Sequence, residues 1–339
     1  MKHAASANLA ALVLFSLARW CPAGEPGPGC EHLKALESLV GQRQVVFTRD
    51  GQTKPTGVEK AEWILNKNFL LHDCWGYFNE EPTRYAIATG WNPQTKEISQ
   101  WVAGGNANMY ILQERTGVLD PETKTWKARL QGIASGGGKH SGDLRMALAG
   151  DKVTLDLTGV REDGKAASDI HIVFSPEIDM ATPAFDERPG PAYQHLKAIE
   201  WLIGDWDIRI AYPDGTSGVG GQHAEWAFNK NLIRRKGWWT VANGKRIDTL
   251  FWLTWHPEKE KIVTAGCASD GGHGTQVATY DPETKTLTVH HEAVTGAGVE
   301  ISGDCRIRYV NDRQFEQVWT NLRFGNESRD GGKTVFTRK

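Results

Sequence analysis

The chain carries two copies of one eight-residue segment. AEWILNKN begins at Ala61 and AEWAFNKN begins at Ala224, an offset of 224 − 61 = 163 residues. A second segment, DPETKT, begins at Asp120 and again at Asp281, an offset of 281 − 120 = 161 residues. Such a near-constant offset in a chain of 339 residues predicts one domain that occurs twice in tandem, with short insertions and deletions in its loops.

Each copy opens with a short amphipathic helix. In the first copy, over residues 31–41, Leu33, Leu36 and Leu39 recur at helical spacing and a glycine ends the helix. The same pattern returns over residues 194–204. We therefore place the start of each domain at these helices.

The repeat divides the chain into two domains and a linker. The first domain is predicted over residues 30–175 and the second over residues 193–339. Between them, residues 176–192 contain four prolines and scattered charge, which is typical of a linker.

After each helix, apolar and polar residues alternate and turn-forming residues recur, which is the pattern of a β-meander. About ten sequential antiparallel strands cannot stay flat, because strand twist accumulates until the sheet curls and closes. The predicted fold is all-β: two tandem antiparallel meander β-barrels of about ten strands, each wide enough for one small ligand. In the second copy the strands are expected near residues 205–212, 219–229, 231–241, 245–255, 260–269, 273–281, 285–293, 299–310, 312–321 and 330–338.

Residues 1–23 have the pattern of a secretory signal peptide. The apolar run over residues 10–18 is shorter than the roughly 20 residues that a helix needs to span a bilayer. Cleavage is expected after Ala23, and the alternative is a lipoprotein in which Cys21 is lipidated. We expect an exported protein, periplasmic or extracellular, with no integral membrane segment after signal removal.

The charges and cysteines limit the classes of partner. With 39 basic and 41 acidic residues, the chain has no excess charge that favours nucleic acid or an anionic membrane surface. Export permits disulfides, and the four cysteines that remain after cleavage allow three full pairings, among which the sequence does not choose. These cysteines are Cys30, Cys74, Cys267 and Cys305.

The second copy reads Gly204-Asp205-Trp206 directly after its helix and ends with Arg338 on its last strand. This resembles the signature of the calycin (lipocalin-like) superfamily. The resemblance implies that Arg338 packs over Trp206 and closes the floor of the barrel, in a cation–π contact.

Residues 193–339 as a whole are similar to a lipocalin-like domain of unknown function found in exported bacterial proteins. The first copy departs from the pattern. Arg43 stands where Trp206 stands in the second copy, and Pro176 falls near the position of Arg338. We therefore expect its barrel floor to be closed differently.

Six further tryptophans occur at repeated positions. We expect them to fill the core and the barrel ends, because an indole ring buries a large area. The alternative is that some of them line a cavity for an apolar or planar ligand. The pairs are Trp63 and Trp226, Trp75 and Trp238, and Trp91 and Trp255.

Among the histidines, His171 is the candidate for cofactor binding. It lies on the last strand of the first copy, where haem-binding barrels that resemble nitrobindin place an axial ligand. The alternative is an ordinary strand histidine. His290 and His291 are adjacent, so in a strand they point to opposite faces and do not share a metal ion. We expect no metal and no cofactor, with haem as the alternative.

No nucleophile elbow, paired catalytic carboxylates or phosphate-binding loop occurs in the sequence. The leading hypothesis is non-catalytic binding of a small, largely apolar molecule. Two alternatives are a structural or interaction module of the cell envelope with filled barrels, and a haem-binding or enzymatic barrel.

Overall fold

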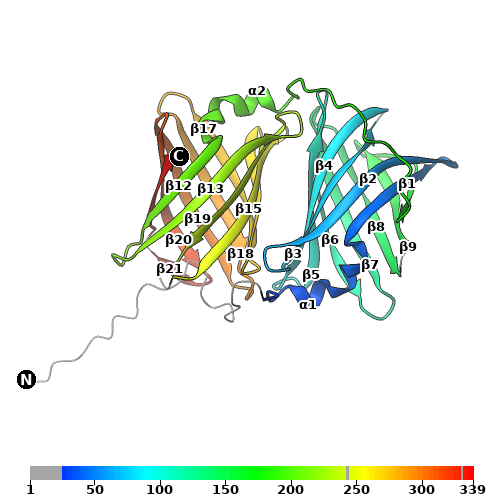
Figure 1. Cartoon of the computed structure of the whole chain (residues 1–339), viewed down its shortest axis with the longest axis horizontal. Helices are drawn as coiled ribbons and strands as arrows, with labels where there is room; N and C mark the ends of the chain where they lie inside the picture. The colour runs from blue at the N-terminus through cyan, green and yellow to red at the C-terminus, as the bar shows by residue number, and fades with distance from the viewer. Residues whose placement is uncertain (1–24, 79, 151, 242–243, 330) are drawn as a thin grey trace, which may run out of the picture.

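The computed structural model describes residues 25–78, 80–150, 152–241, 244–329 and 331–339. It consists of two β-barrels that lie side by side, with the helix of one barrel at the opposite end from the helix of the other (Figure 1). The predicted signal peptide, residues 1–23, lies outside the described residues. Among those residues, no helix has the length and apolar character that a membrane span requires.

Barrel 1 follows the helix α1 (Cys30–Leu33) and the 3-10 helix η1 (Lys34–Leu39). Ten antiparallel strands close it, since β9 pairs with both β8 and β11, and β11 pairs with β1. The short β10 (Lys165–Ala166) extends the sheet beside β9. The ten strands are β1 (Gly41–Arg49), β2 (Gln52–Ile64), β3 (Phe69–Phe78), β4 (Glu81–Asn92), β5 (Glu97–Gly105), β6 (Tyr110–Asp120), β7 (Thr125–Ala134), β8 (Lys139–Ala149), β9 (Lys152–Glu162) and β11 (Ile170–Ser175).

Barrel 2 repeats this architecture after α2 (Tyr193–Leu196) and the 3-10 helix η2 (Lys197–Leu202). Its ten strands close through the pairings of β20 with β19 and β22, and β21 (Glu327–Arg329) extends β20. The ten strands are β12 (Gly204–Ala211), β13 (Ser217–Ala227), β14 (Leu232–Thr240), β15 (Arg246–His256), β16 (Lys261–Ala268), β17 (His273–Asp281), β18 (Thr286–Val294), β19 (Glu300–Asn311), β20 (Gln314–Phe324) and β22 (Lys333–Arg338).

The predicted fold class is confirmed: both halves are closed antiparallel barrels preceded by a short helix. The strands β10 and β21 were not predicted, because two or three residues are too few to show an alternating pattern. All four described cysteines are free thiols, so none of the disulfide pairings that the sequence left open is formed.

The repeated AEW segment ends in a tight turn. Leu65, Asn66 and Lys67 have φ angles of 50°, 58° and 57°, so three successive residues are left-handed. Residues 228–230 repeat this conformation after β13. Asparagine adopts this region more readily than most residues, which explains why the turn contains it in both copies.

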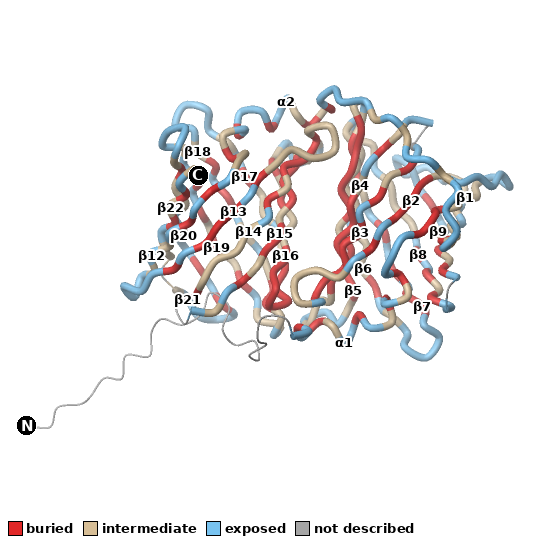
Figure 2. Tube along the Cα trace, in the orientation of Figure 1, coloured by how far each residue is buried: buried red, intermediate tan, exposed pale blue. Residues whose placement is uncertain are grey.

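The outer faces of β3–β5 pack against the outer faces of β14–β16. Buried residues concentrate on these facing strands (Figure 2). The strands are therefore covered on both sides, by their own barrel interior and by the other barrel. The buried residues of the shared apolar cluster are Phe69, Leu71, Ala86, Ala88, Ala103, Leu232, Leu250, Trp252 and Cys267.

Two asparagine side chains cross the interface in equivalent ways. The Nδ2 of Asn68 donates to the carbonyl of Ser269 at 2.9 Å, and the Nδ2 of Asn231 donates to the carbonyl of Asn106 at 2.8 Å. The two asparagines are equivalent, since 231 − 68 = 163, and each reaches a backbone carbonyl just after the fifth strand of the opposite barrel. The tandem thus packs like a twofold dimer, in which one patch meets its own copy.

The segment between the barrels contacts both of them. The guanidinium of Arg84 in barrel 1 lies 3.9 Å from the ring centroid of Phe185. The Nδ2 of Asn229 in barrel 2 donates to the carbonyl of Arg188 at 2.9 Å. Residues 176–190 therefore connect the barrels as an irregular segment held by specific contacts.

Candidate functional site

The floor of barrel 2 is closed by Trp206 and Arg338. Trp206 is only 1% exposed, and its Nε1 donates to the carbonyl of Leu202 at 2.9 Å. The guanidinium of Arg338 lies 4.4 Å from a ring centroid of Trp206 and donates to the carbonyl of Ile203 at 3.0 Å. The pair therefore joins the first strand, the last strand and the end of the helix.

Barrel 1 closes its floor with a different side chain. Arg43, at the position of Trp206, is buried, and its Nη2 donates to the carbonyl of Ser38. Ser38 is equivalent to Trp201, since 201 − 38 = 163, and the Trp201 carbonyl accepts from Arg338 at 3.3 Å. An arginine thus satisfies the same helix-end carbonyl in both barrels, from the first strand in one and the last strand in the other.

Four of the repeated tryptophans tie the helices to the barrel ends. Two donate their indole hydrogen to a carboxylate of the 3-10 helix, and two stack on a histidine of the α-helix. The donor–acceptor distances are 2.7 Å for Trp63–Glu37 and 3.1 Å for Trp226–Glu200. The ring centroids are 4.1 Å apart in Trp91–His32 and 4.2 Å apart in Trp255–His195.

The other predicted site residues lie on outer surfaces. Trp75 and Trp238 are half-buried on the outside of their barrels, and Arg246 covers Trp238 at 4.5 Å. His171 is also on the outside, with its Nδ1 2.6 Å from Asp156 Oδ1. It does not point into the interior, where the haem hypothesis would need it. The described residues contain no cluster of three or more metal-ligating side chains.

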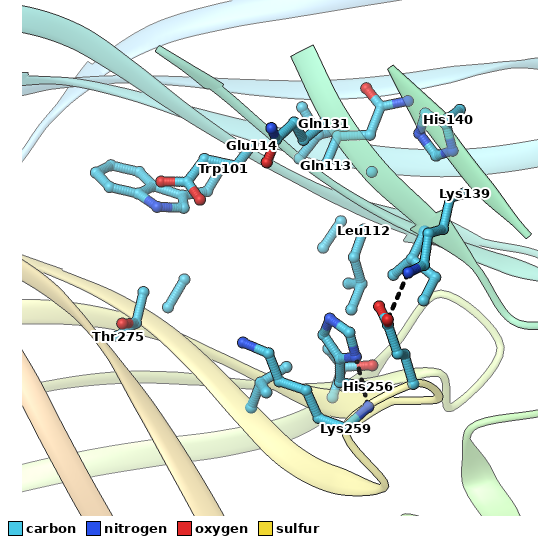
Figure 3. A pocket seen from close by; sticks show the side chains of 18 of the residues that line it. Trp101, Leu112, Gln113, Glu114, Gln131, Lys139, His140, His256, Lys259 and Thr275 are labelled. Carbon is cyan, nitrogen blue, oxygen red and sulfur yellow. Dashed lines mark hydrogen bonds and ion pairs between the residues drawn. The ribbon is translucent and has the colours of Figure 1, made fainter. Parts of the chain in front are cut away.

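A groove of about 720 Å³ lies between the two barrels. Figure 3 shows Trp101 and Glu114 on the barrel 1 side and Thr275 opposite them. The groove opens beside the rim of barrel 1, where Lys139 pairs with Glu258 of barrel 2. Its apolar walls consist of Trp101, Ala103, Leu112, Ile133, Leu232, Trp252, Val263, Ala265 and Val277.

The groove exists because equivalent positions on its two walls differ in size. Trp101 is directly opposite Glu114 in the β5–β6 ladder, and Ala265 is directly opposite Thr275 in the β16–β17 ladder. These two cross-strand pairs are equivalent, since 265 − 101 = 164 and both join the fifth strand of a barrel to the sixth. The smaller pair leaves space that a second tryptophan would fill.

A few polar atoms face this apolar space. The indole Nε1 of Trp101 is buried and has no hydrogen-bond partner in the part of the chain that the structure describes. The surrounding protein raises the pKa of Glu114 by desolvation, an effect that the charge of Lys259 opposes. The walls therefore offer one free donor and one carboxylate that is partly shielded from bulk water.

Sequence reasoning did not identify Trp101 or Trp252, because neither belongs to a repeated tryptophan pair. One signal was present around Trp252. Residues 250–253 are four consecutive apolar residues, which is typical of a strand buried on both faces. That run indicates a second partner for the sheet, although it does not say which surface covers it.

No family model matches the chain, and no curated protein matches it. Among solved structures, a redesigned β-barrel is similar over 42% of this chain and 95% of its own, with 16% identity and a TM-score of 0.26. A redesigned β-barrel bound to DFHBI covers 42% of this chain and 98% of its own, also at 16% identity and a TM-score of 0.26. A protein of unknown function from the DUF3598 family of Nostoc punctiforme covers 91% of this chain and 99% of its own, with 8% identity and a TM-score of 0.23. Similarities this weak carry no argument about the function of this chain.

Proposed function

We propose that the protein binds a small, largely apolar molecule without catalysis, and that the binding site is the groove between the barrels. This keeps the kind of ligand expected from the sequence and moves the site from the barrel interior to the interface.

The observation that carries this proposal is the groove itself. Its volume of about 720 Å³ falls within the usual range of small-molecule pockets, roughly 300–1,000 Å³. Its walls are mainly apolar, with two indole rings and a small number of polar groups, and it lies at a domain interface, where such sites often occur.

The polar atoms define the expected ligand. The unpartnered Nε1 of Trp101 calls for a hydrogen-bond acceptor, because a buried donor without a partner is costly. Glu114 would accept a hydrogen bond from a donor on the ligand. We therefore expect a flat, apolar body with an acceptor near its centre.

Nile red, a neutral planar dye with one carbonyl acceptor, is a suitable probe. We expect its fluorescence to rise with one-to-one stoichiometry on binding to the full chain. Ala265→Trp adds a second indole to the residues that line the groove with Trp101 and should weaken the binding by at least tenfold. Ala149→Trp makes the same change at an exposed strand end and should leave the binding unchanged. Equal binding by the wild type and Ala265→Trp would remove the groove as the site.

The proposal includes export. The apolar run over residues 10–18 supports it, and these residues lie outside the described part of the chain. Intact mass spectrometry of protein from an exporting bacterial host should give a chain that begins at Gly24. A mass that includes a diacylglyceryl group on Cys21 would instead support the lipoprotein alternative, and a full-length cytosolic chain would contradict export.

A further inference from the structure

Arg235 lies inside barrel 2, in the middle of β14. Its neighbour along the inner face, Ile233, belongs to the core of this barrel, and the Arg235 guanidinium lies 5.8 Å from the ring centroid of Phe251. Only 9% of Arg235 is exposed. A guanidinium remains protonated at neutral pH, so the interior of barrel 2 contains a positive charge.

No carboxylate among the described residues balances this charge. Within that part of the chain Arg235 forms no ion pair, whereas the adjacent Arg234 on the outer face pairs with Glu225 at 2.7 Å. Along the described strands of barrel 2, acidic residues occupy outward-facing positions or strand ends, as shown by the surface ion pairs of Asp304 and Glu316. Burial lowers the pKa of Arg235 to about 10, which reflects a charge held away from water without a counter-ion.

The hydrogen bonds around Arg235 leave donors in excess. Both its Nε, at 3.0 Å, and its Nη2, at 2.5 Å, donate to one oxygen, Oε1 of Gln222. The Nε2 of Gln222 is buried and finds no acceptor among the described residues. Among the described residues, hydrogen-bond donors therefore outnumber acceptors around this unbalanced positive charge, and a carboxylate supplies both acceptors and negative charge.

Barrel 1 contains the counter-charge that barrel 2 lacks. Glu59 and His72 are equivalent to Gln222 and Arg235, since 222 − 59 and 235 − 72 both equal 163. His72 Nδ1 lies 3.0 Å from Glu59 Oε1. Burial lowers the pKa of the half-buried Arg115 in this network, and the charges of Tyr85 and Glu59 oppose that shift. The interior of barrel 1 is thus neutralised by its own residues.

Barrel 2 also has more room beside its arginine. Gly237 and Thr249 are paired next to Arg235, where barrel 1 has the larger pair Cys74 and Tyr85. On neighbouring strands of the interior, Gln276 Nε2 lies 3.3 Å from His291 Nδ1. The ring centroids of His291 and Trp319 are 5.6 Å apart. Inward-facing Phe251, Gln276, His291 and Trp319 are all only half-buried, so the interior is not completely filled.

We propose that the interior of barrel 2 binds a monocarboxylate with an apolar body, whose carboxylate accepts hydrogen bonds from Arg235 and Gln222. The apolar body lies against Phe251 and Trp319. This site is separate from the groove between the barrels and goes beyond the function proposed above, because it selects an anion.

The test is calorimetric titration of the full chain with octanoate, decanoate and dodecanoate, each compared with the alcohol of the same length. We expect at least one carboxylate to bind one-to-one and at least tenfold more tightly than its alcohol. Arg235→Met should remove that preference. Arg234→Met, the same change one residue away on the outer face, should keep it. Circular dichroism verifies the fold of each variant.

The proposal is overturned if no carboxylate binds the folded wild type, if the alcohols bind as well as the acids, or if a folded Arg235→Met binds the acids unchanged. If Arg235→Met does not fold, Arg235→Lys is measured in its place. Because lysine keeps the positive charge, this variant should still bind the carboxylate more tightly than the alcohol, as the wild type does. Ala265→Trp separates the two sites, because it fills the groove and should leave carboxylate binding intact. Loss of carboxylate binding in that variant would assign the acid to the groove.

Discussion

Replacement of Trp206 by alanine tests the closure of barrel 2 most directly. The side chain is 1% exposed and packs edge to face against Phe315, with ring centroids 4.7 Å apart. Its Nε1 donates to Leu202, and Arg338 covers its face. The substitution removes the ring, leaves a buried carbonyl without its donor and exposes the arginine to a cavity.

The expected loss of unfolding free energy is about 3–5 kcal/mol, the usual cost of a fully buried tryptophan-to-alanine change. The lost hydrogen bond favours the upper half of this range, because an unsatisfied buried acceptor costs about 1–3 kcal/mol. Native-state hydrogen exchange with mass spectrometry measures the effect in barrel 2 alone. Peptides from β12 and β22 should exchange roughly two to four powers of ten faster, at about 1.4 kcal/mol for each factor of ten.

Trp238→Ala is the matched control. This half-buried tryptophan lies on the outer face of the same barrel, so its removal should cost only about 1–2 kcal/mol. The reasoning is refuted if Trp206→Ala costs no more than the control, because the indole would then not support the junction of helix, first strand and last strand.

Two further predictions concern the interface. Asn231→Ala leaves the buried N–H of Ala192 and the carbonyl of Asn106 without their partner, so the free energy of unfolding in urea should fall by about 2–6 kcal/mol. Asn311→Ala at an exposed turn is the control and should lower it by less than about 1 kcal/mol. Equal losses in the two variants would contradict a role for Asn231 in holding the barrels together. Burial raises the pKa of Asp270 to about 6 and lowers that of His273 to about 4. Ionisation of Asp270 above its unfolded pKa therefore destabilises the fold, and so does protonation of His273 below its unfolded pKa. Relative to the wild type, the unfolding free energy of Asp270→Asn should rise by about 3 kcal/mol between pH 4 and 7, and that of His273→Gln should fall by a similar amount. Parallel pH profiles for both variants and the wild type would show that neither group is buried in solution.

Much of the fold could be predicted because its signals are local. The Leu33, Leu36 and Leu39 spacing predicted a helix, and all three side chains are at most 1% exposed. The strands could be predicted from alternation and turn residues. The groove could not, since it depends on which outer faces meet, and a tryptophan on an outer face looks the same in the sequence whether it meets solvent or another sheet. The buried position of Arg235 could not be predicted either. An arginine in a predicted strand is normally assigned to the surface, and only the closed barrel shows that this one lies on the inner face.

The sequence by itself determined the tandem, the helix and strand order of each copy, and the composition of the repeated turn, because these depend on residues that are close along the chain. The tertiary structure alone decided that Asn68 and Asn231 reach across to the opposite barrel, that Trp101 and the smaller Ala265 line one groove, and that no described acid pairs with Arg235. Each of these facts joins residues from different strands or barrels. Barrel closure and sheet packing bring them together, and no local pattern in the sequence encodes those distances.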